Sequence, residues 1–279
     1  DGKACQFYND LFVYDLKEAS WYKVVTALGP GPRSAHQAVW SPCGRQLYVF
    51  GGEFGTSKET RFLHYRDFWC LNVDDWSWTN LTGGQLPPSR SGHRMATVGG
   101  DLIVLFGGFI DTSGSATYLD DLWLYKFSTG SWTRVDWLNV HAPKPSPRSA
   151  FQFCPFAEEG GAFGVLLYGG YCQVKGKSGI PQGQVLHDTW VLKLDPSDLS
   201  QLRWDKKKTG STAPVARSGP SSACLPSGNG MLLFGGVFDE DIGDEFIQGT
   251  CSNDLFSYDF KTNKWAQLNY GLNATSHGA

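Results

Sequence analysis

The stretch Leu102 to Gly108, LIVLFGG, decides the fold of this chain because it recurs three more times. The other copies are LYVFGG from Leu47, VLLYGG from Val165 and MLLFGG from Met231. Each run is apolar at consecutive positions, which predicts a strand buried on both faces. The closing glycine pair predicts a tight exit from the strand, at positive φ or against another backbone. The pairs are Gly51–Gly52, Gly107–Gly108, Gly169–Gly170 and Gly235–Gly236.

Three other elements accompany the apolar runs in a fixed order. An Arg-Ser-small triplet precedes each run, an Asp followed by alternating apolar residues comes after it, and a Trp follows that Asp. In one repeat, the insertion DPSDLSQL delays the Trp. A repeat of four strand-length segments is typical of a β-propeller blade. The triplets begin at Arg33, Arg90, Arg148 and Arg217, the acidic residues are Asp10, Asp67, Asp121, Asp188 and Asp254, and the tryptophans are Trp21, Trp78, Trp132, Trp204 and Trp265.

The repeated tryptophans are interpreted as spacers between blades. Burying one indole removes ~150 to 250 Å² from water, which stabilises the fold by about 4 to 6 kcal/mol as an upper bound. The Trp78→Ala substitution is therefore expected to cost about 3 to 5 kcal/mol.

The predicted fold class is all-β, a propeller of four-stranded antiparallel blades in a single domain of residues 1–279. An N-terminal half blade at 7–27 lacks its inner two strands, and an open sheet edge is a feature that proteins avoid. We therefore expect the chain to be a fragment, with residues upstream of Asp1 supplying the missing strands. The four complete blades are expected at about 33–82, 90–137, 148–208 and 217–270.

These residues resemble the kelch repeat, whose pattern is an Arg-Ser-Gly-His start, an apolar strand ending in Gly-Gly, an Asn-Asp-Leu-x-x-Tyr-Asp strand and a spaced Trp. All 279 residues take part in the resemblance. Stretches such as SGHRM at Ser91 and FGGVFDED at Phe234 resemble one subgroup, kelch domain-containing protein 4 and its fungal relatives. The resemblance implies a propeller, commonly of five to seven blades, that serves as a protein-interaction scaffold or adaptor.

One face of such a propeller is the better candidate for binding. The segments joining strands 2 to 3 emerge on the same face as those joining strand 4 to the next blade. The 2-3 segments are long and divergent, whereas most 1-2 and 3-4 connections are short turns. Long variable loops on a rigid scaffold usually carry recognition.

The candidate partner-binding residues lie in these 2-3 segments. Aromatic side chains close to the channel mouth would be binding anchors if they are exposed. Alternatively, they pack beneath the loops as satellite core. An acidic last loop and the basic run Lys206–Lys208 would orient a partner, unless both are simply solvated charge. The candidates are Phe54, Arg61, Phe109, Tyr118, Tyr171, Phe238, Asp239 and Asp241.

The four repeated arginines admit two interpretations. As a ring of guanidinium groups they would grip a carboxylate or phosphate. However, the repeated Asp begins strand 3 at the same end of each blade, which favours a structural Arg-Asp pair within the blade. Repetition in every blade also indicates architecture rather than an active site.

No enzyme activity, metal site or cofactor is predicted. His36 and His93 share one repeat position that is Phe151 and Pro220 in the other blades, and His64, His141, His187 and His277 show no common metal spacing. The second hypothesis is a galactose-oxidase-like copper enzyme or a carbohydrate-binding propeller in a secreted protein. A third is a substrate adaptor for ubiquitin transfer, which would require an attached segment outside these residues.

The amino-acid composition restricts the class of partner and the cellular compartment that we expect for this chain. A formal net charge of -3 excludes a strongly basic nucleic-acid binder. The longest apolar stretch is far shorter than the ~18 residues of a membrane span. Seven scattered cysteines without C-x-x-C spacing indicate neither a disulfide framework nor a zinc site, and the sequons at Asn80 and Asn273 are no more than weak signs of secretion. We therefore expect a protein partner, no nucleic acid and no membrane, inside the cell in the cytoplasm or nucleus.

Overall fold

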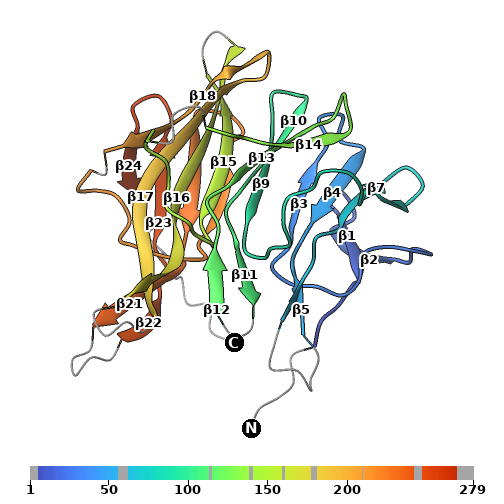
Figure 1. Ribbon diagram of the computed structural model, residues 1–279, viewed down its shortest axis with the longest axis horizontal. Coiled ribbons are helices and arrows are strands. Elements are labelled where there is room, and N and C mark those ends of the chain that lie inside the picture. Colours follow the sequence, from blue (N-terminus) through green and yellow to red (C-terminus); the bar gives the residue numbers. More distant parts are fainter. Residues whose placement is uncertain are drawn as a thin grey trace.

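The computed structural model in Figure 1 describes residues 6–55, 62–112, 115–137, 141–158, 161–176, 181–208, 210–241 and 247–268. Its regular structure consists of strands, paired antiparallel into four sheets of four strands and several two-stranded sheets. The all-β fold predicted from the repeat is therefore confirmed. The described residues contain no helix long and apolar enough to cross a membrane.

The four-stranded sheets are the blades, and they follow one another in chain order. Blade 1 consists of β3 (Gln37–Trp40), β4 (Gln46–Phe50), β7 (Phe68–Asn72) and β8 (Ser77–Asn80), and blade 2 of β9 (Arg94–Val98), β10 (Leu102–Phe106), β13 (Leu122–Lys126) and β14 (Ser131–Arg134). Blade 3 consists of β15 (Gln152–Ala157), β16 (Phe163–Lys175), β17 (Pro181–Asp195) and β18 (Asp198–Lys207), and blade 4 of β19 (Ser221–Cys224), β20 (Gly230–Phe234), β23 (Leu255–Asp259) and β24 (Lys264–Gln267).

A half blade precedes blade 1. Its strands β1 (Leu11–Asp15) and β2 (Ser20–Val24) pair with each other in a two-stranded sheet. The Arg33 amide donates to the Tyr8 carbonyl at 3.2 Å, just as the Arg90 amide donates to the Tyr65 carbonyl at 3.3 Å. The half blade thus makes the same backbone contact with blade 1 that blade 1 makes with blade 2.

The hydrophobic core lies between the blades rather than within one sheet. Trp132 of blade 2 packs against Phe50 and Phe68 of blade 1, with ring centroids 5.8 and 5.2 Å apart. Trp204 packs in the same way on Phe106, at 5.1 Å, and Trp265 on Tyr168, at 4.7 Å. Trp132, Trp204 and Trp265 therefore each cover the preceding blade.

The expectation that all five tryptophans are buried spacers is wrong for two of them. Trp132, Trp204 and Trp265 are each 4% exposed, whereas Trp78 is half-buried and Trp21 is 69% exposed. The reason is that each Trp needs the sheet before it. Trp78 has only the two-stranded half blade there, and the described chain places no sheet before Trp21.

The glycine pairs combine both features predicted for them. Gly51 and Gly52 have φ of 66° and 96°. A Cβ on Gly51 would lie 2.6 Å from the Arg90 carbonyl oxygen of the next blade, and one on Gly52 would lie 2.7 Å from the Ser34 carbonyl oxygen. Any side chain at these positions would therefore separate two backbones that must touch.

The long 2-3 segments, expected to be loops, are hairpins. β5 (Glu53–Phe54) pairs with β6 (Leu63–His64), β11 (Phe109–Thr112) with β12 (Ser115–Tyr118), and β21 (Val237–Asp241) with β22 (Ile247–Cys251). In blade 3, β16 and β17 continue past the glycine pair through a register shift between Tyr168 and Gly170. These hairpins extend toward the lower side of Figure 1.

The cysteine spacing indicated no disulfide framework, but the structure contains a disulfide. Cys154 on β15 and Cys224 on β19 form a disulfide with their Cα atoms 6.2 Å apart. They are 70 residues apart in sequence and occupy the innermost strands of neighbouring blades. Only the blade order brings them together, so their spacing along the chain gave no sign of the bond.

Candidate functional site

The candidate site is the face that carries the hairpins β5–β6, β11–β12, the extended ends of β16 and β17, and β21–β22; we call it the hairpin face. The residue after each glycine pair is anchored to the serine of an Arg-Ser triplet. The Ser91 amide donates to the Phe109 carbonyl at 3.0 Å, and the Phe109 amide donates back at 2.9 Å. The same bridge joins Ser34 to Glu53, Ser149 to Tyr171 and Ser218 to Val237.

A chain of backbone hydrogen bonds joins the triplets from blade to blade. The Gly92 amide donates to the Ala35 carbonyl at 3.0 Å, the Ala150 amide to Gly92 at 3.1 Å, and the Gly219 amide to Ala150 at 2.8 Å. All four residues have positive φ, between 52° and 64°. We call this feature the axial chain. It fixes the base of each hairpin relative to its neighbours.

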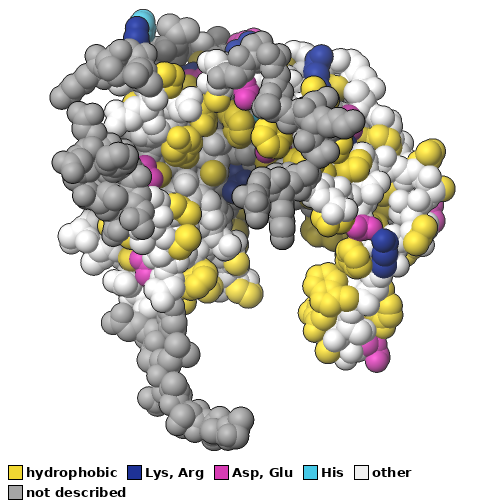
Figure 2. Space-filling model, turned by 90° about the horizontal axis from the view of Figure 1, so that it is seen from below, with side chains coloured by type: hydrophobic (Ala, Val, Ile, Leu, Met, Phe, Trp, Pro, Cys, Tyr) yellow, Lys and Arg dark blue, Asp and Glu magenta, His cyan; other side chains and the backbone are white. Residues whose placement is uncertain are grey.

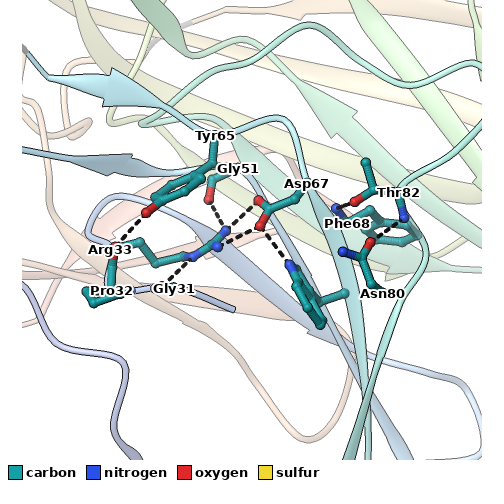
Figure 3. A network of polar contacts seen from close by, with 10 residues as sticks. Gly31, Pro32, Arg33, Gly51, Tyr65, Asp67, Phe68, Asn80 and Thr82 are labelled. Atoms are coloured by element: carbon teal, nitrogen blue, oxygen red, sulfur yellow. Dashed lines mark hydrogen bonds and ion pairs between the residues drawn. The ribbon is translucent and has the colours of Figure 1, made fainter. Parts of the chain in front are cut away.

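Each repeated arginine forms an ion pair with the repeated Asp of its own blade, at the base of the hairpin. Arg90 is fully buried, and its two terminal nitrogens donate to the Asp121 carboxylate at 2.7 Å each. A further bond from Arg90 reaches the Gly107 carbonyl at 2.9 Å. Figure 3 shows the equivalent network in blade 1, where Arg33 holds Asp67 and the Gly51 carbonyl. Arg148 pairs with Asp188 and Arg217 with Asp254 in the same way.

The charge state of these pairs follows from two opposed effects. Burial raises the pKa of Asp121, but the hydrogen bonds and charge of Arg90 outweigh burial and hold that pKa below its usual value. The Trp123 indole also donates to the carboxylate, at 2.7 Å. Since each guanidinium already has a carboxylate, the ring of arginines does not present free cations to a ligand.

The aromatic candidates form a row along the hairpin face, and each is half-buried. Phe109 stacks on Tyr118 with centroids 5.7 Å apart, and Tyr118 meets the edge of Tyr171 at 6.0 Å. Phe54 contacts Phe7 at 5.3 Å. Burial raises the pKa of Tyr118 to about 12, so its hydroxyl stays protonated at neutral pH. These rings pack on one another and still reach solvent, so their exposure is compatible with either interpretation offered by the sequence.

The structure gives fewer contacts for the remaining partner-binding candidates. Phe238 lies half-buried on β21, and Asp239 beside it is exposed. Asp241 ends β21, where its backbone pairs with Ile247. Arg61 lies outside the described residues. Figure 2 views the molecule from the side of the hairpins and shows hydrophobic side chains scattered over the described part of this face.

A polar cluster on this face escaped the sequence analysis. The Asp111 amide donates to His64 Nε2 at 2.9 Å, so the ring proton lies on Nδ1, which contacts the Ser91 hydroxyl at 3.0 Å. Ser91 in turn donates to the Glu53 carboxylate at 2.7 Å. Burial lowers the pKa of His64, despite the opposing charges of Glu53 and Asp111. The sequence feature that could have indicated this cluster is the position of Glu53 directly after a glycine pair.

This cluster couples blades 1 and 2 beneath the aromatic row. His64 also meets the edge of Phe109, with centroids 5.4 Å apart. Since Glu53 and His64 belong to β5–β6 and Phe109 and Asp111 to β11, the two hairpins are held together by both polar and aromatic contacts. In the described part of the chain, no three His, Cys, Asp or Glu side chains are grouped to hold a metal ion.

The blades, the axial chain and the buried Arg-Asp pairs define a kelch β-propeller. The structure of YjhT has a similar fold, with a TM-score of 0.64 at 16% identity over 93% of this chain and 77% of that one. The family model described as KLHDC2/KLHL20/DRC7 Kelch-repeats domain matches residues 1–198. This chain belongs to that kelch-repeat family.

Several curated proteins are similar in sequence. Host cell factor of Drosophila melanogaster is 27% identical over 93% of this chain and 17% of its own length. Kelch domain-containing protein 1 of Homo sapiens is 29% identical over 59% of this chain and 37% of its own length. Kelch domain-containing protein 2 of Bos taurus is 32% identical over 50% of this chain and 32% of its own length. The chain thus spans well under half of each relative, and the narrower resemblance to kelch domain-containing protein 4 stays a prediction.

Proposed function

We propose that this chain is a protein-binding module, a scaffold or adaptor that holds a partner on the hairpin face. The observation that carries the proposal is the row of half-exposed aromatic rings, Phe109, Tyr118 and Tyr171, at the bases of neighbouring hairpins. Aromatic side chains that are preorganised by packing and still reach solvent are typical anchors of protein interfaces.

The scaffold supports this role because it separates stability from recognition. The Arg-Asp pairs and the axial chain repeat in each blade, whereas the residue after the glycine pair is Glu53, Phe109, Tyr171 or Val237. A rigid, repeated base that carries different side chains is the arrangement expected of a recognition surface. The proposal includes binding without catalysis, and a protein as partner rather than nucleic acid or membrane.

We place this interaction inside the cell, in the cytoplasm or nucleus. The Cys154–Cys224 disulfide makes that placement testable, since such bonds are rare in reducing compartments. When free thiols are blocked at the moment of lysis and the cysteines are read by mass spectrometry, recovery of Cys154 and Cys224 in the reduced form would support the intracellular placement. Recovery of the bonded pair from cells would instead assign the protein to an oxidising compartment.

The binding role is tested by affinity capture with mass spectrometry. The test protein carries Phe109→Ala and Tyr171→Ala, and its matched control carries Phe12→Ala and Tyr22→Ala on the half blade. Phe12 and Tyr22 are 52% and 51% exposed, so the control removes the same two residue types from a different surface. Both proteins are first shown to melt as the native chain does.

The expected result is that specific partners are lost from the hairpin-face variant and retained by the control. Retention of the same partners by both proteins, or capture of none by the native chain, would overturn the proposed face. Loss from both would show that exposed aromatic residues bind non-specifically.

A further inference from the structure

The outermost strand of blade 3 differs from those of the other blades in length. β8, β14 and β24 have four residues each, whereas β18 has ten. Its added length includes the last five residues, DLSQL, of the insertion that delays Trp204 in the sequence. β17 lies on one side of β18, and among the described residues its sheet has no strand on the other. Its free edge therefore presents backbone donors and acceptors to solvent.

A basic groove runs along the side of β18 that faces blade 4. One cavity of about 450 Å³ is lined by Lys193, Lys207 and Lys261, and a second of about 490 Å³ is lined by Lys207, Lys208 and Lys264. Both cavities also share Asn263, so they form one groove.

The positive charge of this groove is only partly neutralised. Lys193 pairs with Glu158 at 3.1 Å, and Lys207 lies 4.0 Å from Asp205. Within the described ranges, Lys208, Lys261 and Lys264 form no ion pair with a carboxylate. In a chain whose net charge is -3, this is a local excess of cations beside an open strand edge. The groove therefore favours an acidic ligand.

The opposite side of β18 is mostly apolar. A cavity of about 540 Å³ between the outer strands of blades 2 and 3 is lined mainly by apolar residues, among them Val135, Trp137, Leu199 and Leu202, although Asp136, Arg203 and Asp205 also line it. Trp204, beside it, is buried against Phe106 of blade 2. Lys207 is on the other face of the strand, opposite Thr189, whose hydroxyl accepts from Trp265 of blade 4. The two grooves thus flank one strand on its two faces.

We propose that β18 binds an extended segment of a partner protein in which apolar and acidic residues alternate. Added as a fifth strand, such a segment points successive side chains to opposite faces of the sheet. Its acidic residues then enter the basic groove, its apolar residues enter the apolar groove, and its backbone satisfies the free edge of β18. A nucleic acid would match only the lysines, since its phosphates gain nothing from Leu199 and Leu202.

The proposal is tested with fluorescein-labelled (Val-Glu)5 by fluorescence anisotropy on the whole chain. The test variant carries Lys207→Glu and Lys264→Glu, and the matched control carries Lys17→Glu and Lys126→Glu on other surfaces. The peptide should bind the native chain and the control alike, and the test variant about ten-fold more weakly. A (Val-Lys)5 peptide should not bind.

Hydrogen exchange provides a second measurement that does not depend on any variant. Bound (Val-Glu)5 should slow amide exchange in residues 198–207, because an added strand pairs with that edge. The Phe109→Ala, Tyr171→Ala protein should bind the peptide normally, so this proposal can fail while the hairpin face stands. No binding by the native chain, equal binding of (Val-Lys)5, displacement by single-stranded DNA, or unchanged exchange in β18 would each overturn it.

Discussion

His93 is the residue with the least favourable surroundings in the described core. Its side chain is fully buried against Phe50, and neither ring nitrogen has a hydrogen-bond partner. Burial, helped by the charges of Arg90 and Arg94, holds the pKa of His93 well below its usual 6.5. The same repeat position is filled by Phe151 in blade 3, which is also fully buried.

The His93→Phe substitution should therefore raise the free energy of unfolding by about 1 kcal/mol at neutral pH, because a buried unpaired polar group is removed. The effect should grow on acidification. The unfolded chain protonates His93 below about pH 6.5 while the folded chain does not, so stability falls as the pH drops. Urea unfolding at pH 7.5 and 5.5 measures both. The exposed His187→Gln control should keep the full pH dependence; an unaltered slope in His93→Phe would contradict the assignment.

Asp121, unlike His93, stabilises the fold at neutral pH, and its folded-state pKa is lowered as well, so both residues reduce stability on acidification. Asp121→Asn leaves the buried Arg90 guanidinium without its counter-charge and should cost about 3 to 5 kcal/mol. Since the folded-state pKa of Asp121 is lowered, this contribution is present above about pH 4 and is lost as the pH falls further. Thermal unfolding of Asp121→Asn beside the exposed Asp75→Asn gives the comparison. Similar losses in both proteins would show that the pair contributes little.

At the scale of the structural element, the repeated Trp contributes a different amount to the free energy of unfolding in different blades. The sequence predicts a loss of about 3 to 5 kcal/mol for Trp78→Ala, but Trp78 is only half-buried. The structure assigns that loss to Trp132→Ala, since Trp132 is 4% exposed and contacts three rings of blades 1 and 2. Trp21→Ala, at 69% exposure, should cost under about 1 kcal/mol. Equal losses at Trp132 and Trp21, measured by urea unfolding, would refute this ranking.

Much of the element structure follows from the sequence, because burial on both faces leaves a strong pattern. The apolar runs, the glycine pairs and the partnership of each repeated Arg with an Asp are visible along the chain. The hairpins are not visible, since β5 pairs two residues with two and carries no alternating pattern. The His64 cluster and the Cys154–Cys224 bond are likewise hidden, because each joins residues of two blades that meet only after folding.

At the scale of the whole molecule, the two ends of the arc of blades expose surfaces that the interior blades bury. Phe50 and Phe106 close their apolar runs fully buried, whereas Phe234, at the same position in blade 4, is 47% exposed. At the other end, Trp21 and Trp40 are 69% and 51% exposed. Another repeat packed against either end would cover these surfaces, as the interior blades cover Phe50 and Phe106.

In isolation, these surfaces should drive the chain to self-associate. Sedimentation velocity at increasing concentration should show oligomers, and Trp21→Ser with Phe234→Ser should reduce them at little cost in stability. Phe106→Ser, at the equivalent buried position, should instead destabilise the chain by more than about 3 kcal/mol. A monomeric native chain at all concentrations would contradict the assignment of these surfaces as unfilled blade contacts.

The axial chain also bears on how such a protein changes over evolutionary time. Each junction between Ala35, Gly92, Ala150 and Gly219 is made by main-chain groups at one repeat position. Duplicating or deleting a whole repeat therefore recreates the same junction, whatever side chains the new copy carries. Gene rearrangement can alter the size of the ring, and point mutation can diversify the hairpin tips, without either process disturbing the other.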